Sequence, residues 1–126
     1  MDAEPATHAD FPETDPEALE RLRRFGGDKL LGDMITLFLA AMPQRLGAAR
    51  SGLAHEDCHV VEHELHALKS SAAQLGALRM HRLSQEGERL AKAGATEGLS
   101  RILDELDAEA PRVREWLGAA RAREDG

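Results

Sequence analysis

Apolar residues recur every three or four positions over most of the chain, which is the spacing of one face of an α-helix. The longest such stripe follows Asp28, which we expect to cap this helix, and consists of Leu31, Ile35, Phe38, Met42, Leu46, Ala49 and Leu53. Pro43 lies inside this stripe and cannot donate a backbone hydrogen bond. Because the stripe continues beyond Pro43, we expect a kink near residues 39–43 rather than the end of the helix.

Three further apolar stripes predict three more helices. The first begins near Asp57, a suitable N-cap, and ends near Gly76, with a buried face of Val61, Leu65, Leu68, Ala72 and Leu75. The second ends at Gly94 and carries Met80, Leu83, Gly87 and Leu90. The third carries Leu99, Leu103, Leu106, Ala110, Val113 and Leu117, and we expect Pro111 to bend it.

The two ends of the chain have a different pattern. Residues 1–14 mix acidic, small and proline residues without helical periodicity, so we expect a flexible acidic leader there. A short helix should begin after Asp15, with Pro16 in its first turn, and stop at Gly26 and Gly27. Residues 120–126 should form a flexible tail.

No segment alternates apolar and polar residues long enough to predict a β-strand. The sequence therefore predicts an all-α fold. Long amphipathic helices joined by short connections favour an antiparallel, up-down-up-down four-helix bundle over residues 15–119. The short N-terminal helix should cover one end of this bundle.

Composition narrows the possible functions. A chain of 126 residues has room for one domain, and its formal net charge of −7 disfavours binding to nucleic acid or to an anionic membrane. The single cysteine cannot form an internal disulfide, and no apolar run reaches the roughly 20 residues of a membrane span. We therefore expect a cytoplasmic protein with protein partners, and a monomer because such a bundle exposes little apolar surface.

His66 is the candidate for chemistry. A rotation of about 100° per residue places His66 about 140° away from the centre of the buried stripe, so its imidazole should face solvent. Its neighbours on that surface are Glu62, Lys69, Ser70 and Ala73. Lys69 can offset negative charge one turn along, and the small residues leave the ring accessible. A neutral imidazole is a competent nucleophile towards phosphorus.

The stretch from His66 to Gly76 resembles the signature of histidine phosphotransfer (HPt) domains. The matching residues are His66, Leu68, Lys69, Ser70, Ser71, Ala72, Leu75 and Gly76. Most members of that family have glycine four residues after the histidine, where this chain has Ser70. The hydroxyl of Ser70 either narrows the approach to the imidazole or adds a hydrogen bond to the phosphoryl group.

The resemblance implies a role for each matching position. His66 would accept a phosphoryl group in a two-component phosphorelay, and Lys69 would help to neutralise it. A response-regulator receiver domain would dock over Glu62, His63, Ser70 and Ala73 and would supply both an aspartate and Mg²⁺. The chain itself would then need no cofactor and would have no autonomous catalytic activity. A sensor or hybrid histidine kinase would be the other partner.

Three alternatives compete with this interpretation. His55, His59 and His63 recur every four residues and, with Cys58, suggest a transition-metal site, although one helix turn supplies only two ligands. A helical adaptor that is never phosphorylated would have the same fold. The phosphoacceptor part of a sensor kinase is disfavoured because nothing after Leu78 resembles an ATP-binding domain.

Overall fold

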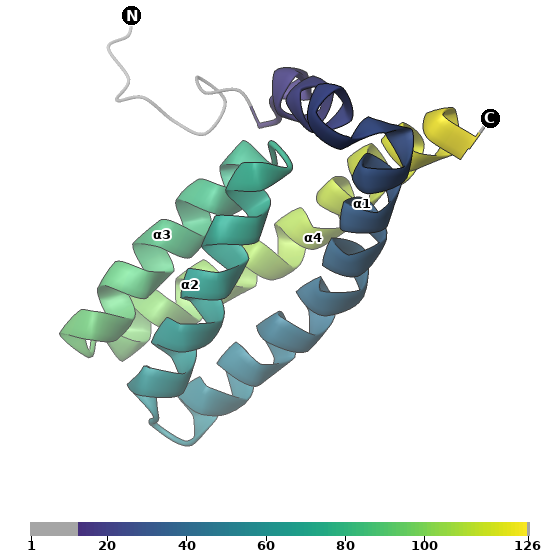
Figure 1. The fold of residues 1–126 in the computed structure, drawn as a ribbon. Helices are drawn as coiled ribbons and strands as arrows, with labels where there is room; N and C mark the ends of the chain where they lie inside the picture. The colour runs from purple at the N-terminus through teal and green to yellow at the C-terminus, as the bar shows by residue number, and fades with distance from the viewer. Residues whose placement is uncertain (1–12, 126) are drawn as a thin grey trace, which may run out of the picture.

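The computed structural model describes residues 13–125, and this part of the chain forms four helices. Figure 1 shows them as an antiparallel bundle in which each helix follows its predecessor through a short connection, which confirms the predicted all-α fold. The part of the predicted leader that comprises residues 1–12 lies outside the described residues.

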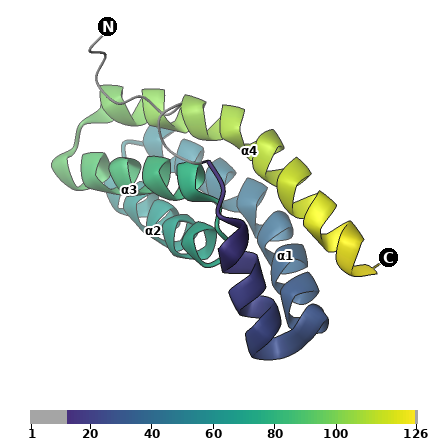
Figure 2. The same ribbon diagram turned by 90° about the horizontal axis from the view of Figure 1, so that it is seen from above.

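Helix α1 spans Pro16–Ala54 and contains one break, at Gly27. Gly27 has φ 82° and ψ −179°, dihedrals that a residue with a Cβ rarely adopts. The break separates the short N-terminal helix from the long one, as the two glycines predict. Figure 2 shows the short helix turning away from the long part of α1 at the end of the bundle. The backbone stays helical through Pro43.

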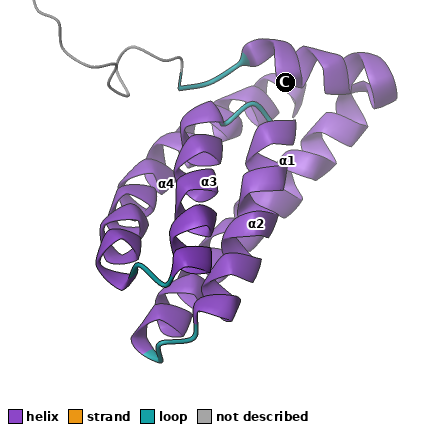
Figure 3. Ribbon diagram, turned by 90° about the vertical axis from the view of Figure 1, so that its left-hand side faces the viewer, coloured by secondary structure: helices purple, strands orange, loops and turns teal. Residues whose placement is uncertain are grey.

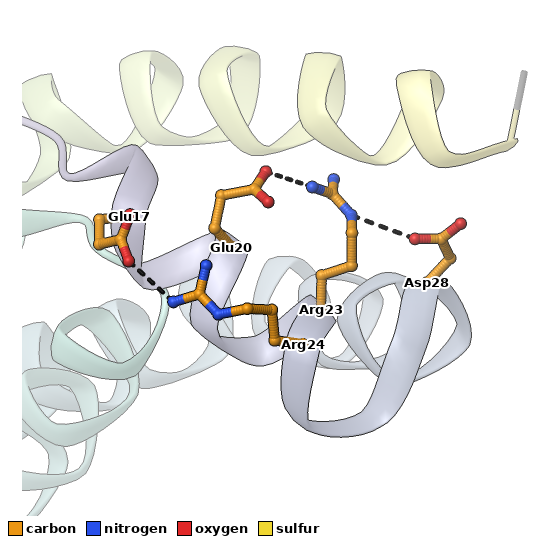
Figure 4. Close-up of polar contacts among 5 residues, drawn as sticks. All are labelled: Glu17, Glu20, Arg23, Arg24 and Asp28. Atoms are coloured by element: carbon orange, nitrogen blue, oxygen red, sulfur yellow. Dashed lines mark hydrogen bonds and ion pairs between the residues drawn. The ribbon is translucent and has the colours of Figure 1, made fainter.

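The ion pair between Arg23 and Asp28 joins the two sides of this break, and two further pairs lie within the short helix, as Figure 4 shows. Arg23 contacts Glu20 and also donates from Nε to Asp28 at 3.1 Å, and Arg24 donates to Glu17 at 2.9 Å. We expected Asp28 to cap the second part of the helix, but its carboxylate binds the Arg23 guanidinium. These exposed pairs each contribute little to stability.

The remaining helices are α2 (Cys58–Gln74), α3 (Leu78–Ala93) and α4 (Thr96–Asp125). Asp57 caps α2 by accepting a hydrogen bond from the Val60 amide at 3.3 Å, and Gly94 ends α3 in the left-handed conformation. Figure 3 shows only short loops between these helices. Helix α4 extends past residue 119, so the predicted start of a flexible tail at residue 120 is wrong.

The N-terminal segment is attached to the turn between α2 and α3. The Asp15 amide donates to the Gly76 carbonyl at 2.8 Å, and the Arg79 amide donates to the Glu13 carbonyl at 3.2 Å. Ala18 and Leu19, at the start of the short helix, are buried. The short helix therefore covers this end of the bundle, as predicted.

The core is one apolar cluster to which all four helices contribute. Its largest fully buried members are Leu31, Ile35, Met42, Val61, Leu65, Leu68, Leu75, Met80, Leu99, Leu103, Leu106 and Leu117. Because these side chains fix α2 against α1 and α3, the opposite face of α2 must point to solvent.

Candidate functional site

His66 lies on the solvent-facing side of α2. Its side chain is 61% exposed, whereas Leu65 and Leu68, on the core side of the same helix, are buried. This is the orientation that the helical geometry predicts. The imidazole is therefore open to a protein partner.

A carboxylate from the neighbouring helix binds His66. Glu88, on α3, places its Oε2 2.9 Å from His66 Nδ1 and its Oε1 2.7 Å from Lys69 Nζ. Glu88 is itself only 7% exposed. One buried carboxylate thus bridges the imidazole and the ammonium group that lies one helical turn after it.

Gly87 allows α3 to come close enough for this contact. A Cβ built on Gly87 would lie 2.5 Å from Leu65 Cδ1, closer than real side chains approach. Only glycine fits between the two helices at this point without a shift of α3 or of Leu65. Since Glu88 directly follows Gly87 and Leu65 directly precedes His66, the close approach places the carboxylate beside the imidazole.

The charge on Glu88 determines which nitrogen of His66 can react. The hydrogen bond from Lys69 lowers the pKa of Glu88, burial opposes this effect, and the His66 contact lowers the pKa further. An ionised carboxylate only accepts hydrogen bonds, so Nδ1 carries the proton and the lone pair lies on Nε2. Among residues 13–125, Nε2 has no hydrogen-bond partner. Nε2 is therefore the ring nitrogen whose lone pair is available for chemistry.

Two lysines lie next to Glu88, and they are held differently. Lys69 is half-buried and lies 2.7 Å from Glu88 Oε1. Lys92, on α3, is exposed, and its Nζ lies 3.8 Å from both Glu62 Oε2 and Glu88 Oε2. Only the second ammonium is loosely held.

The four residues expected to contact a partner lie around His66 on α2. His63, Ser70 and Ala73 are exposed, and Glu62 is half-buried beside Lys92. The small residues Ser70 and Ala73 leave the side of the imidazole facing the helix C-terminus uncovered.

An apolar groove of about 230 Å³ lies between α1 and α2. Its lining includes Met34, Leu37, Phe38, Leu68 and Leu75. Leu37, in the lining of this groove, is 70% exposed, so part of the apolar surface faces solvent. This groove gives α2 an apolar flank on the side away from α3.

A model of the Hpt domain family matches residues 33–116, which is most of the bundle and includes the whole of α2 and α3. The chain belongs to the Hpt domain family. Its fold matches the crystal structure of histidine-containing phosphotransfer protein B (HptB) from Pseudomonas aeruginosa PAO1 with a TM-score of 0.84 and 20% sequence identity. That match covers 89% of this chain and 96% of the HptB chain. A comparison with curated protein sequences finds no significant match.

Membership of the Hpt family fixes the role of the chain in outline. It is a phosphotransfer protein of a phosphorelay, and such domains interact with receiver domains and kinases. No helix in the described part of this Hpt chain is long and apolar enough to cross a membrane.

Sequence reasoning missed Glu88, which binds His66, and Lys92, whose Nζ lies 3.8 Å from Glu88 Oε2. Both lie on α3, and the contact of Glu88 with His66 depends on how α3 is placed along α2. The only signal in the sequence was Gly87, a small residue on the inner face of α3, which indicates a close helix contact.

The metal-site alternative has no structural support in residues 13–125. No three histidine, cysteine or acidic side chains converge there in a way that could hold a metal ion. The Nδ1 atom of His55 instead contacts the Ser51 carbonyl at 2.8 Å.

Proposed function

We propose that His66 accepts a phosphoryl group on Nε2 from a receiver-domain aspartate or a hybrid kinase and passes it to a response regulator. The observation that carries this proposal is the exposed imidazole whose Nδ1 is bound by a buried, ionised carboxylate. That contact leaves Nε2 free to attack and keeps the ring in one orientation.

The transfer step is a substitution at phosphorus. The Nε2 lone pair forms a bond to phosphorus while the bond from phosphorus to the aspartyl oxygen breaks, and the aspartate leaves as a carboxylate. The proton stays on Nδ1, so the phosphorylated ring is a cation that carries a phosphoryl dianion. Glu88 stabilises this ring charge as it develops, since its Oε2 accepts the Nδ1 hydrogen bond. Glu88 is therefore a positioning residue for His66.

Lys69 has two tasks in this proposal. In the unphosphorylated protein its ammonium neutralises Glu88. After transfer, the Lys69 ammonium can also donate a hydrogen bond to the phosphoryl oxygens, because an ammonium group has three N–H donors. When Lys69 compensates the phosphoryl charge, its contact with Glu88 therefore becomes weaker.

The partner docks across α2 in this proposal. Glu62, His63, Ser70 and Ala73 surround His66, and the apolar groove beside Leu37 extends the contact to α1. An apolar patch next to an exposed reactive group is typical of a transient protein interface. The receiver brings the aspartate and Mg²⁺, and the carrier performs no turnover of its own.

We further propose that the carrier acts as a cytoplasmic monomer. Large apolar side chains exposed on residues 13–125 are confined to Phe25, Leu37 and Val60. Of these, Leu37 belongs to the proposed docking surface, which leaves little apolar area for self-association.

The test is transfer of label from phosphorylated receiver domains to the purified chain. We expect acid-labile label on the wild-type protein and none on His66→Gln. His59→Gln is the matched control, because His59 is an exposed histidine on the same helix that lies outside the proposed docking residues and does not contact Glu88. Label that persists in His66→Gln would move the site elsewhere, and absence of label from every receiver would favour a helical adaptor.

A further inference from the structure

A shallow hollow of about 430 Å³ lies beside His66 on the side of α3. It is lined by Lys69, Arg82, Gln85, Glu86, Glu88, Arg89 and Lys92. It is a different place from the apolar groove, which lies between α2 and α1. We call this second surface the basic hollow.

The charges in the basic hollow are unlike those of the chain as a whole. Four of its lining side chains are basic and two are acidic, in a protein whose formal net charge is −7. Both acidic side chains already have basic partners within the hollow: Glu88 binds Lys69, and Glu86 accepts two hydrogen bonds from Arg89, at 2.9 and 2.5 Å. Arg89 and Lys92 remain exposed to solvent. Glu62 offsets part of the Lys92 charge from outside the hollow.

We propose that the basic hollow is a second docking surface, which attracts the carboxylate-rich rim around the phosphoacceptor aspartate of the partner receiver. This inference rests on the proposed function of His66. A protein site that holds Mg²⁺ and a phosphorylated aspartate is built from carboxylates, so the partner must bring negative charge towards His66. The hollow offers the complementary charge directly next to the imidazole.

The two surfaces lie on opposite sides of α2. In Figure 1, α2 lies between α1 and α3, so the groove flanks His66 on one side and the hollow on the other. Burial of apolar surface in the groove stabilises the complex once it has formed. Charge complementarity acts over a longer range and mainly raises the association rate. The hollow therefore determines how fast a receiver arrives in the orientation that transfer requires.

The first experiment measures association rates by stopped flow, with the receiver domain that labels the chain fastest in the transfer assay. The variant Arg89→Gln/Lys92→Gln should lower the association rate constant about 3- to 10-fold at low salt and should flatten its dependence on ionic strength. The matched control, Lys29→Gln/Arg101→Gln, removes the same charge from exposed positions on α1 and α4 and should leave both quantities near the wild-type values.

Equal losses in the two double variants would show a general charge effect and would overturn the proposal, as would an unchanged rate in the first. Failure of the proposed function is separate, because it appears as label that persists in His66→Gln whatever the association rates are.

A second experiment does not depend on a receiver. A titration of the chain with an oligo-aspartate peptide, followed by amide NMR shifts, should perturb Arg89 and Lys92 before Lys29 and Arg101. The perturbation should fade as salt is added. Uniform shifts over all exposed cations, or none at any of them, would refute a specific basic surface on α3.

Discussion

Gly87 and Leu65 are in such close contact that a single added methyl group on Gly87 would lie 2.5 Å from Leu65 Cδ1. Because Glu88 follows Gly87, this contact also determines where the carboxylate meets His66. A change in the packing of α3 against α2 should therefore alter both stability and the site.

We predict that Gly87→Ala lowers the free energy of unfolding by about 1–3 kcal/mol, since overpacking outweighs the better helix propensity of alanine. Urea denaturation measures this loss. Gly47→Ala is the control, because Gly47 is exposed on a helix with nothing within 4 Å of an added Cβ. There, the same substitution should stabilise the protein by about 0.5–1 kcal/mol. Equal effects at the two sites would mean that α3 moves freely to accommodate the methyl group.

Glu88→Gln should destabilise the protein at neutral pH by about 1–3 kcal/mol, because His66 Nδ1 and Lys69 Nζ each lose a charged hydrogen-bond acceptor. The pKa of Glu88 is lowered in the folded state, so ionised Glu88 stabilises the fold above the ordinary carboxyl value of 4.5. This stabilisation is lost as the pH falls towards the lower, folded-state value. The difference in stability between the wild type and Glu88→Gln should therefore become smaller at acidic pH.

Thermal melts at a series of pH values test the Glu88 prediction. Glu115→Gln, at an exposed position on α4, should change stability little at any of them. A gap for Glu88→Gln that stays constant down to strongly acidic pH would argue against an ionised Glu88. The transfer assay on the same variant should also show slower labelling of His66, because the ring loses the group that stabilises its positive charge.

Lys69→Ala removes the ammonium that lies closest to Glu88. We expect transfer to His66 to slow roughly 5- to 30-fold, which corresponds to the loss of one charged hydrogen bond of 1–2 kcal/mol. Rapid-quench measurement of labelled protein gives this rate. Lys29→Ala, at an exposed position on α1, should transfer like the wild type. Wild-type kinetics in Lys69→Ala would show that Lys69 serves stability alone.

Gly76 provides a test of the N-terminal attachment. It has φ 77°, and an added Cβ would lie 2.4 Å from the Asp15 carbonyl oxygen, whereas Gly94, with φ 69°, has open space around it. Gly94→Ala should therefore lower the free energy of unfolding only by the penalty of the left-handed backbone conformation, about 1–2 kcal/mol. Gly76→Ala should cost more, because it also displaces Asp15, and the amide of Asp15 should then exchange hydrogen faster. Equal costs would show that the N-terminal attachment contributes nothing.

Glu109 should behave in the opposite way to Glu88. It is 3% exposed, and burial raises its pKa although Arg79 and Arg112 lie 3.8 and 3.6 Å away. A raised folded-state pKa favours the fold below the ordinary value of 4.5, and this advantage is lost as the pH rises through the folded-state value. As the pH rises from acidic to neutral, Glu109→Gln should therefore become more stable relative to the wild type. Thermal melts that show a constant or shrinking difference would contradict this.

The helices and the exposure of His66 follow from the sequence, because both depend on the periodicity within one helix. Leu65 and Leu68 define the buried side of α2, and this places His66 on the opposite side. The contact with Glu88 could not be predicted, since it depends on the register between α2 and α3. That register arises from side-chain packing, such as the fit of Leu65 against Gly87, which a single sequence does not specify.

The end of the last helix was predictable but was placed too early. Ala120 continues the spacing of Val113 and Leu117, and all three are buried. The small and charged residues that follow Leu117 hide this continuation, because they resemble a polar chain end. An alanine can extend an apolar stripe as well as a larger residue where the neighbouring helix lies close.

The Glu88 bridge joins the histidine and the lysine of the signature through a third residue that lies outside it. The proposed nucleophile and its proposed counter-charge are therefore not two independent features of one helix. A substitution on the buried side of α3 that rotates or slides that helix would displace both together, so the reactivity of His66 can be tuned through residues outside both proposed docking surfaces.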